Sequence, residues 1–93
     1  MHLEIVSPEA TLFSGDVTSV TVPGTDGEFQ MLDNHAPIIS LLEEGTVKIK
    51  GNITIKEKFK SKFTQGKEAN EMLLNISSGT VEMKDNNAII LAD

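Results

Sequence analysis

The stretch VTSVTVPGTDGEFQML, residues 17–32, decides the fold class of this chain. Its first six residues are valines, threonines and a serine, and β-branched residues of this kind favour a strand. The turn cluster Pro23-Gly24-Thr25-Asp26-Gly27 follows, and a short apolar run, Phe29–Leu32, comes after it. Short β-type runs separated by turn residues are typical of sandwich and barrel folds.

Similar short runs lie on both sides of this stretch. They occupy residues 2–7, 11–13, 38–42, 46–50, 72–76, 81–83 and 88–91. Pro8 ends the first run because proline cannot donate to a strand ladder. Asp85-Asn86-Asn87 is expected to join the last two runs as a hairpin turn. The run at residues 38–42 is apolar except for Ser40, which predicts a buried strand. We therefore expect one all-β domain over residues 1–93, a flattened β-sandwich or barrel of about ten short strands.

The segment from Ile53 to Phe63 has two competing patterns. Ile55, Phe59 and Phe63 are four residues apart, as on one face of a helix. However, the apolar residues occupy odd positions and the lysines occupy even ones, and this alternation favours a long strand. Its lysine face would comprise Lys56, Lys58, Lys60 and Lys62. After a turn at residues 65–67, this strand is expected to pair with residues 72–76.

The lysine face itself allows two interpretations. Lysines on an exposed strand discourage edge-to-edge aggregation of a small sandwich. Alternatively, the face meets an acidic surface of a partner, in which case assembly would weaken steeply with salt.

Composition excludes several classes of function. The net charge is −6, and the chain has no Arg, Trp or Tyr, so the basic grooves and stacking platforms of nucleic-acid binding are missing. No Cys is present, which excludes disulfides and thiolate metal sites. No apolar run approaches the roughly 18 residues that a membrane span needs, and no secretion signal is visible. We expect no nucleic-acid partner and no direct membrane insertion.

Catalytic and cofactor motifs are also missing from the sequence. The two histidines, His2 and His35, are not at metal-ligand spacing, and Asp33 beside His35 has no third ligand in sight. The glycine-containing stretch PGTDG lacks the lysine of a phosphate-binding loop. No serine lies in a nucleophile-elbow context. The sequence therefore predicts no catalytic residue, no metal site and no cofactor.

Four segments, in order, carry a family resemblance. They are LEIVSPEATLFSGDVTSVTVPG at 3–24 with PGTDGEF at 23–29, NHAPII at 34–39, GTVKIK at 45–50 and ISSGTVEMKDNNAIILAD at 76–93. Together they resemble the N-terminal β-sandwich of the epsilon subunits of F-type ATP synthases, over about three-quarters of the chain. The sequence stops at Asp93, whereas longer family members continue into a helical hairpin, which we expect to be absent here.

The resemblance implies a rotor function. Such a subunit is non-catalytic and belongs to the central stalk, where it couples proton-driven or sodium-driven rotation to ATP synthesis. The implied partners are the gamma subunit and the ring of c subunits, with catalytic-head subunits as a further candidate. The implied location is peripheral, on the cytoplasmic face of a bacterial inner membrane. The resemblance implies gamma-subunit contacts at Ser7, His35, Ala36, Pro37 and Ile38, and c-ring contacts at Gly27 and Glu28.

Local interpretations stand beside these implied contacts. Ser7 and His35 could cap turns by bonding to the backbone, and Glu28 could be a solvated turn carboxylate. Gly24 and Gly27 suit a turn that needs positive φ, and Asn34 tolerates the left-handed geometry usually given to glycine.

A second class of function, a β-sandwich recognition module for a glycan or a peptide, remains an alternative. Such modules display aromatic platforms, whereas the four Phe residues of this chain lie at expected core positions.

Overall fold

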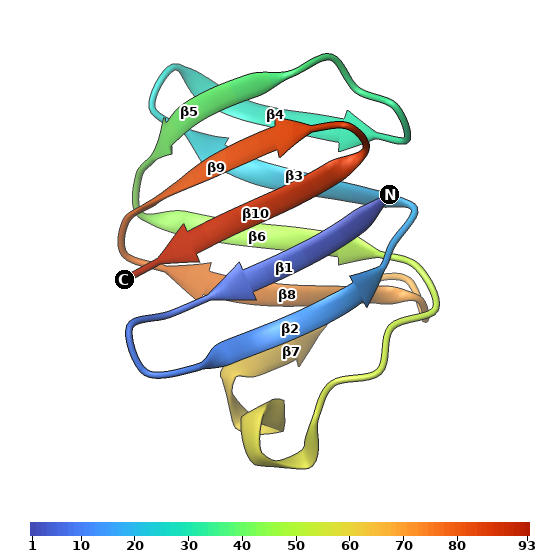
Figure 1. The fold of residues 1–93 in the computed structure, drawn as a ribbon. Helices are drawn as coiled ribbons and strands as arrows, with labels where there is room; N and C mark the ends of the chain where they lie inside the picture. The colour runs from blue at the N-terminus through green and yellow to red at the C-terminus, as the bar shows by residue number, and fades with distance from the viewer.

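Ten strands form two packed layers in the computed structural model, which describes residues 1–93 (Figure 1). The front sheet contains, in spatial order, β2 (Thr11–Asp16), β1 (His2–Val6), β10 (Asn87–Ala92), β9 (Gly79–Lys84) and β5 (Ile38–Leu42). The back sheet contains β4 (Gly27–Leu32), β3 (Ser19–Gly24), β6 (Gly45–Lys50), β8 (Glu71–Ile76) and β7 (Phe63–Gln65). A short 3₁₀ helix, η1 (Glu57–Lys62), precedes β7. The prediction of an all-β sandwich of about ten strands is confirmed.

The two sheets are hydrogen-bonded to each other at only one point. Gly24 of β3 pairs with Leu42 of β5, whereas every other strand pairing stays within one layer. Between the layers lies one core of 22 buried apolar residues. Alternate residues of each strand enter it, because successive side chains of a strand point to opposite faces of its sheet. Val20, Val22 and Ile90 are examples with no exposed surface.

Strand direction gives the sandwich two distinct ends. The N end holds Met1 and the loops at residues 33–37 and 51–52, together with the β9–β10 turn; the C end holds Asp93 and the loops at residues 7–10, 25–26, 43–44 and 77–78 (Figure 1). The register fixes this assignment, since Ile38 at the start of β5 is opposite Met83, and Leu42 at its end is opposite Gly79. Loops at one end can contact one partner surface together, and loops at opposite ends cannot unless the partner spans a whole sheet.

The turns confirm most of the predicted backbone conformations. Gly27 has φ of 120° and Asn34 has φ of 62°, as expected. Asp85 and Asn86 have φ of 50° and 60°, which form the two-residue hairpin turn typical of this pair type. Gly24 differs from the expectation of positive φ. It is required instead for close approach, because an added Cβ would lie 2.8 Å from the Phe29 ring and 2.9 Å from the Gly27 carbonyl oxygen.

The predicted long strand at residues 53–63 is wrong. The chain runs through Ile53–Lys56 without strand pairing, forms η1, and only then enters the short strand β7. The apolar alternation was incomplete, because odd positions 57 and 61 carry Glu and Ser, which are exposed. Ile55, Phe59 and Phe63 are buried, so the spacing of four residues was the stronger signal. The predicted pairing with residues 72–76 is confirmed for the three residues of β7.

Two other strand predictions need correction. The second run continues beyond Phe13, and β2 ends only at Asp16. The prediction that residues 38–42 form a buried strand is half wrong. β5 forms, but Ile39 and Leu41 point away from the core, because β5 has the core on only one of its faces. No helix of the structure is long and apolar enough to cross a membrane.

Candidate functional site

Four large aliphatic side chains lie exposed on the outer surface of the front sheet. Ile39 and Leu41 of β5 are 77% and 66% exposed, and Ile89 and Leu91 of β10 are 41% and 52% exposed. We call these four residues the apolar face. Scattered single apolar residues are normal on protein surfaces, but a contiguous set marks a contact surface.

Strand register brings the four side chains into two rows across β9. Glu82 is opposite both Ile39 on β5 and Ile89 on β10, and Thr80 is opposite both Leu41 and Leu91. Neighbouring strands of a sheet lie about 4.8 Å apart, so each row is about 10 Å wide. The Glu82 carboxylate lies in the middle of this surface and has no ion-pair partner. A complementary surface would therefore be apolar, with one cation or hydrogen-bond donor opposite Glu82.

A shallow hollow lies at each end of the apolar face. At the N end, Pro37, Ile38 and Ile39 line a hollow of about 330 Å³ together with residues 82–84 of β9. At the C end, Leu41 and Leu91 line a hollow of about 470 Å³, which extends to Thr25 in the β3–β4 turn. The face is therefore continuous with concave sites that could accept protruding side chains.

The outer surface of the back sheet is polar. Lys48 Nζ lies 3.4 Å from Glu28 Oε2 across β6 and β4. Thr46 donates to the side-chain carbonyl of Asn75 at 2.9 Å across β6 and β8. We call the outer residues of β4, β3, β6 and β8 the polar face. These two pairs match polar side chains within the chain, and Leu32 is the one exposed large apolar residue of the polar face, whereas the side chains of the apolar face have no partner within the chain.

The predicted contact residues His35, Ala36 and Pro37 form the β4–β5 loop at the N end. The His35 backbone N–H donates to the Leu32 carbonyl at 3.1 Å, and its ring Nδ1 lies 2.7 Å from the Ala36 carbonyl oxygen. These bonds confirm the turn-capping interpretation of His35. Pro37 directly precedes β5, a position that suits a residue without a backbone N–H. Ile38 is half-buried and packs against the core.

The other predicted contact residues lie at the C end. Ser7 Oγ donates to the Ala10 carbonyl at 3.2 Å, which also makes Ser7 a turn-capping residue. Gly27 and Glu28 begin β4 beside the β3–β4 turn at the same end. Ser7 therefore shares this end with Gly27 and Glu28, but the β1–β2 loop and the β3–β4 turn lie at opposite edges of it, and the length of the sandwich separates Ser7 from His35 (Figure 1).

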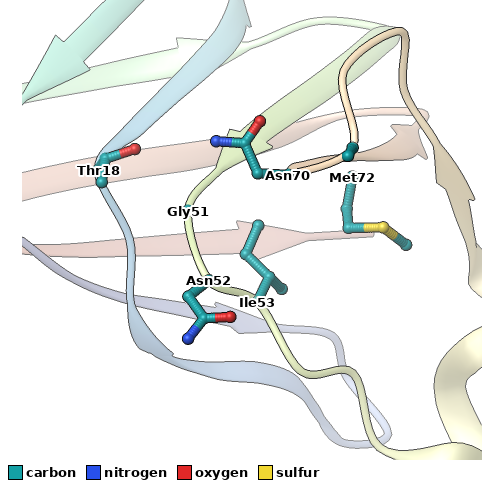
Figure 2. Close-up of a pocket in the computed structure, with 7 residues that line it drawn as sticks. Thr18, Gly51, Asn52, Ile53, Asn70 and Met72 are labelled. Atoms are coloured by element: carbon teal, nitrogen blue, oxygen red, sulfur yellow. The ribbon is translucent and has the colours of Figure 1, made fainter.

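A pocket of about 420 Å³ opens at the N end, where the chain leaves β6 (Figure 2). The carboxamides of Asn52 and Asn70 lie on either side of Gly51, and the apolar part is supplied by Ile53 and Met72. The lining contains no charged group and no nucleophile paired with a base, so the pocket has no equipment for catalysis. No three His, Cys, Asp or Glu side chains come together in a way that could hold a metal ion.

None of the four residues of the apolar face was among the predicted contact residues. Its signal was available in AIIL at 88–91, which is apolar at consecutive positions, and in IISLL at 38–42, where only Ser40 is polar. A strand with one solvated face should alternate apolar and polar residues, so an unbroken apolar run indicates contact on both faces. Both faces of residues 38–42 were predicted to be buried, and the structure shows that the face with Ile39 and Leu41 is exposed.

Comparison with known proteins identifies relatives over the full chain. The ATP synthase delta/epsilon chain β-sandwich domain family matches residues 1–93. The ATP synthase epsilon chain of Campylobacter curvus is 38% identical over 93 residues, and that of Leptospira interrogans is 36% identical over 93 residues. These alignments cover 100% of this chain and 60% and 61% of the relatives, so the chain spans about three-fifths of their length.

Solved structures share the fold at low sequence identity. A chain of the Tetrahymena thermophila mitochondrial ATP synthase central stalk/c-ring structure superimposes with a TM-score of 0.71 at 15% identity. The alignment covers 98% of this chain and 61% of that chain. A chain of the Euglena gracilis mitochondrial ATP synthase gives the same TM-score at 18% identity, over 97% of this chain and 48% of that chain. The match over residues 1–93 and the full-length relatives agree with the sandwich seen here, and the chain belongs to the family of ATP synthase delta/epsilon chain β-sandwich domains.

Proposed function

We propose that this chain is a non-catalytic rotor component of an ATP synthase, which docks on the gamma subunit through its apolar face. The observation that carries the proposal is the exposure of four aliphatic side chains that lie in two rows, Ile39, Leu41, Ile89 and Leu91. No other part of the chain covers them. Membership in the family supports the assignment to an ATP synthase. The names of the relatives, ATP synthase epsilon chains, support the assignment to this subunit.

The energetics favour an apolar contact at this surface. Fully burying a large aliphatic side chain contributes about 1.5–3 kcal/mol, and four such residues form the centre of the proposed interface. Part of this gain is lost to the entropy of association, so the net affinity depends on how well the partner fills the two hollows. Glu82 adds a requirement for a donor on the gamma subunit, because an unpaired carboxylate in a buried interface is strongly unfavourable.

The predicted gamma contacts extend this interface toward both ends. Pro37 and Ile38 line the hollow beside Ile39, so a partner seated on the apolar face would also reach the His35–Ile38 loop. Ser7 follows β1, whose last residue, Val6, is opposite Leu91 of the apolar face. One partner that spans the front sheet could therefore contact His35, Ala36, Pro37 and Ile38 at the N end and Ser7 at the C end.

The C end is proposed to face the ring of c subunits. Gly27 and Glu28 lie there, and the loops around them carry exposed carboxylates at Glu9, Glu43 and Glu44. Polar loops of a ring can donate hydrogen bonds to such a surface. With gamma on the front sheet and the ring at the C end, the sandwich would fix the foot of the stalk to the ring. No bond is made or broken, and torque is transmitted through complementary surfaces.

The location follows from these partners. The chain would be peripheral to the membrane, at the cytoplasmic face of a bacterial inner membrane, and held there through the gamma subunit and the ring.

Titration calorimetry with purified gamma subunit tests the docking surface. The double variant Ile39→Asp, Leu41→Asp places two charges on the apolar face. The matched control, Gln30→Asp with Leu32→Asp, places two charges at the same spacing on exposed positions of β4 in the polar face. We expect the first variant to lose about a hundredfold or more in affinity, and the control to stay within about threefold of wild type. Equal affinity of wild type and the first variant would show that gamma binds elsewhere.

A further inference from the structure

A lysine-rich bulge projects from one edge of the sandwich. It comprises Lys56, Lys58, Lys60 and Lys62, which lie on or next to η1, the coil at the bottom of Figure 1. All four side chains are exposed. Residues 56–62 contain these four lysines and one acid, Glu57, so the bulge carries three net positive charges in a chain whose net charge is −6. Half of the eight lysines of the protein are therefore concentrated within seven residues.

The bulge is held in a defined shape by the core. Ile55, Phe59 and Phe63 are buried and anchor the segment before, within and after η1. The Phe59 N–H donates to the Lys56 carbonyl at 2.9 Å, and the Lys58 ammonium lies 5.1 Å from the centroid of the Phe59 ring. Because the aromatic residues are directed inward, the lysines between them are directed outward. The bulge therefore displays its charge from a fixed position on the sandwich.

Most of this charge is unmatched within the chain. Lys60 Nζ lies 3.0 Å from Glu57 Oε2, and Lys56, Lys58 and Lys62 form no ion pair. The exposed large apolar residues of the protein, Leu32, Ile39, Leu41, Ile89 and Leu91, all lie outside the bulge. The surface of the bulge is thus cationic without an apolar centre.

This chemistry fits an anionic lipid surface better than a protein surface. Protein interfaces are enriched in arginine and aromatic residues and depleted in lysine, and the bulge exposes neither an arginine nor an aromatic ring. Attraction to acidic headgroups instead increases with each exposed lysine near the membrane and requires no shape complementarity.

We propose that the lysine bulge binds the anionic headgroups of the membrane surface next to the rotor. The proposal rests on the proposed function, which turns the C end toward the membrane. Lys62, the last lysine of the bulge, lines a pocket of about 400 Å³ together with Ser7, Glu9 and Asp93, so this part of the bulge lies beside the C end. A lipid layer is fluid, and a contact with headgroups can therefore persist while the rotor turns, whereas a contact with one stationary protein residue cannot.

Vesicle co-sedimentation of the isolated chain tests this inference. The bulge variant changes Lys56, Lys58, Lys60 and Lys62 to Gln. The control variant changes the other four lysines, Lys48, Lys50, Lys67 and Lys84, to Gln, so both variants have the same net charge. We expect wild type and the control to bind vesicles containing roughly one-third phosphatidylglycerol at low salt, and the bulge variant to bind about tenfold or more weakly. Binding should decline steeply with added salt and be absent from pure phosphatidylcholine vesicles.

Three results would overturn the inference. They are no sedimentation of wild type with phosphatidylglycerol vesicles, an equal loss in both variants, or binding of wild type to a polyglutamate peptide without binding to vesicles, which would indicate an acidic protein partner. Gamma binding, measured on the same variants, separates this inference from the proposed function. Normal gamma binding without vesicle binding contradicts the lipid contact alone, and vesicle binding without gamma binding contradicts the docking proposal alone.

Discussion

The two sheets of this sandwich have equivalent inner surfaces and different outer surfaces. Inside, both contribute alternate aliphatic residues to one core. Outside, the back sheet pairs Lys48 with Glu28 and Thr46 with Asn75, so these polar groups have partners within the chain. The front sheet exposes Ile39 and Leu41 on the strand that leads from the His35 loop, with Ile89 and Leu91 on β10.

In a small β-sandwich, the residues that stabilise the fold can be distinguished from those that serve a contact by the face of the strand on which they lie. The core needs one apolar face from each strand, and all ten strands supply buried or half-buried residues for it. An additional apolar face contributes little to the isolated fold, because its residues remain in water. Four exposed large aliphatic residues lie together on β5 and β10, whereas the back sheet exposes only Leu32, and this asymmetry supports the proposed contact outside the chain.

The largest expected effect contrasts two neighbouring residues of β10. Ile90 has no exposed surface, and Ile90→Ala should lower the free energy of unfolding by about 2–5 kcal/mol, because it leaves a cavity. Ile89 is 41% exposed on the apolar face, and Ile89→Ala should lower it by less than about 1 kcal/mol. Urea unfolding followed by circular dichroism measures both. If both variants lowered the free energy of unfolding by similar amounts, the apolar face would stabilise the fold, and the two surfaces of the sheet would not differ in role.

A smaller effect concerns the loop beside the apolar face. His35→Asp adds a charge at the N end, next to the hollow lined by Pro37 and Ile38. We expect gamma affinity to fall by about tenfold, equivalent to about 1.4 kcal/mol, with the circular dichroism spectrum unchanged. The matched control is Asn52→Asp, which adds the same charge to an exposed loop position of the back sheet at this end. If both variants bind as wild type does, His35 acts only as a turn cap.

The smallest effect is expected on the polar face. The Lys48–Glu28 pair is partly exposed, with side-chain accessibilities of 42% and 53%. A double-mutant cycle with Lys48→Ala and Glu28→Ala should give a coupling of about 0.2–1 kcal/mol, as is usual for solvated pairs. The coupling should diminish in high salt. A salt-independent coupling of several kcal/mol would show that the polar face contributes more to stability than its geometry indicates.

Much of the fold could be predicted from the sequence because short β-branched runs and turn residues are local signals. Thr25 and Asp26 of the predicted turn cluster separate β3 from β4, while Pro23, Gly24 and Gly27 belong to the strands, and Asp85-Asn86 forms the predicted hairpin turn. The segment at residues 53–63 could not be predicted in this way. Its three buried aromatic and aliphatic residues fit either a strand or a helical segment, and only the packing against the core decides between them.

The candidate site was less predictable than the fold. The sequence predicts that residues 38–42 form a strand, but it cannot say whether another element covers the outer face of that strand. The exposure of Ile39 and Leu41 depends on the order of strands in the sheet, since β5 pairs with β9 and meets β3 at one point only. The resemblance implied contacts at both Ser7 and His35, and the structure adds that they lie at opposite ends of the sandwich.

We propose that the gamma subunit covers the apolar face and leaves the polar face exposed. Hydroxyl-radical footprinting followed by mass spectrometry measures this directly, because it reports the accessibility of individual aliphatic side chains. Leu32, 53% exposed on the polar face, is an internal control for Leu91, which is 52% exposed on the apolar face. On binding gamma, we predict that oxidation of Ile39, Leu41, Ile89 and Leu91 falls several-fold, while oxidation of Leu32 is unchanged. Protection of Leu32 with no protection of these four residues would contradict the account.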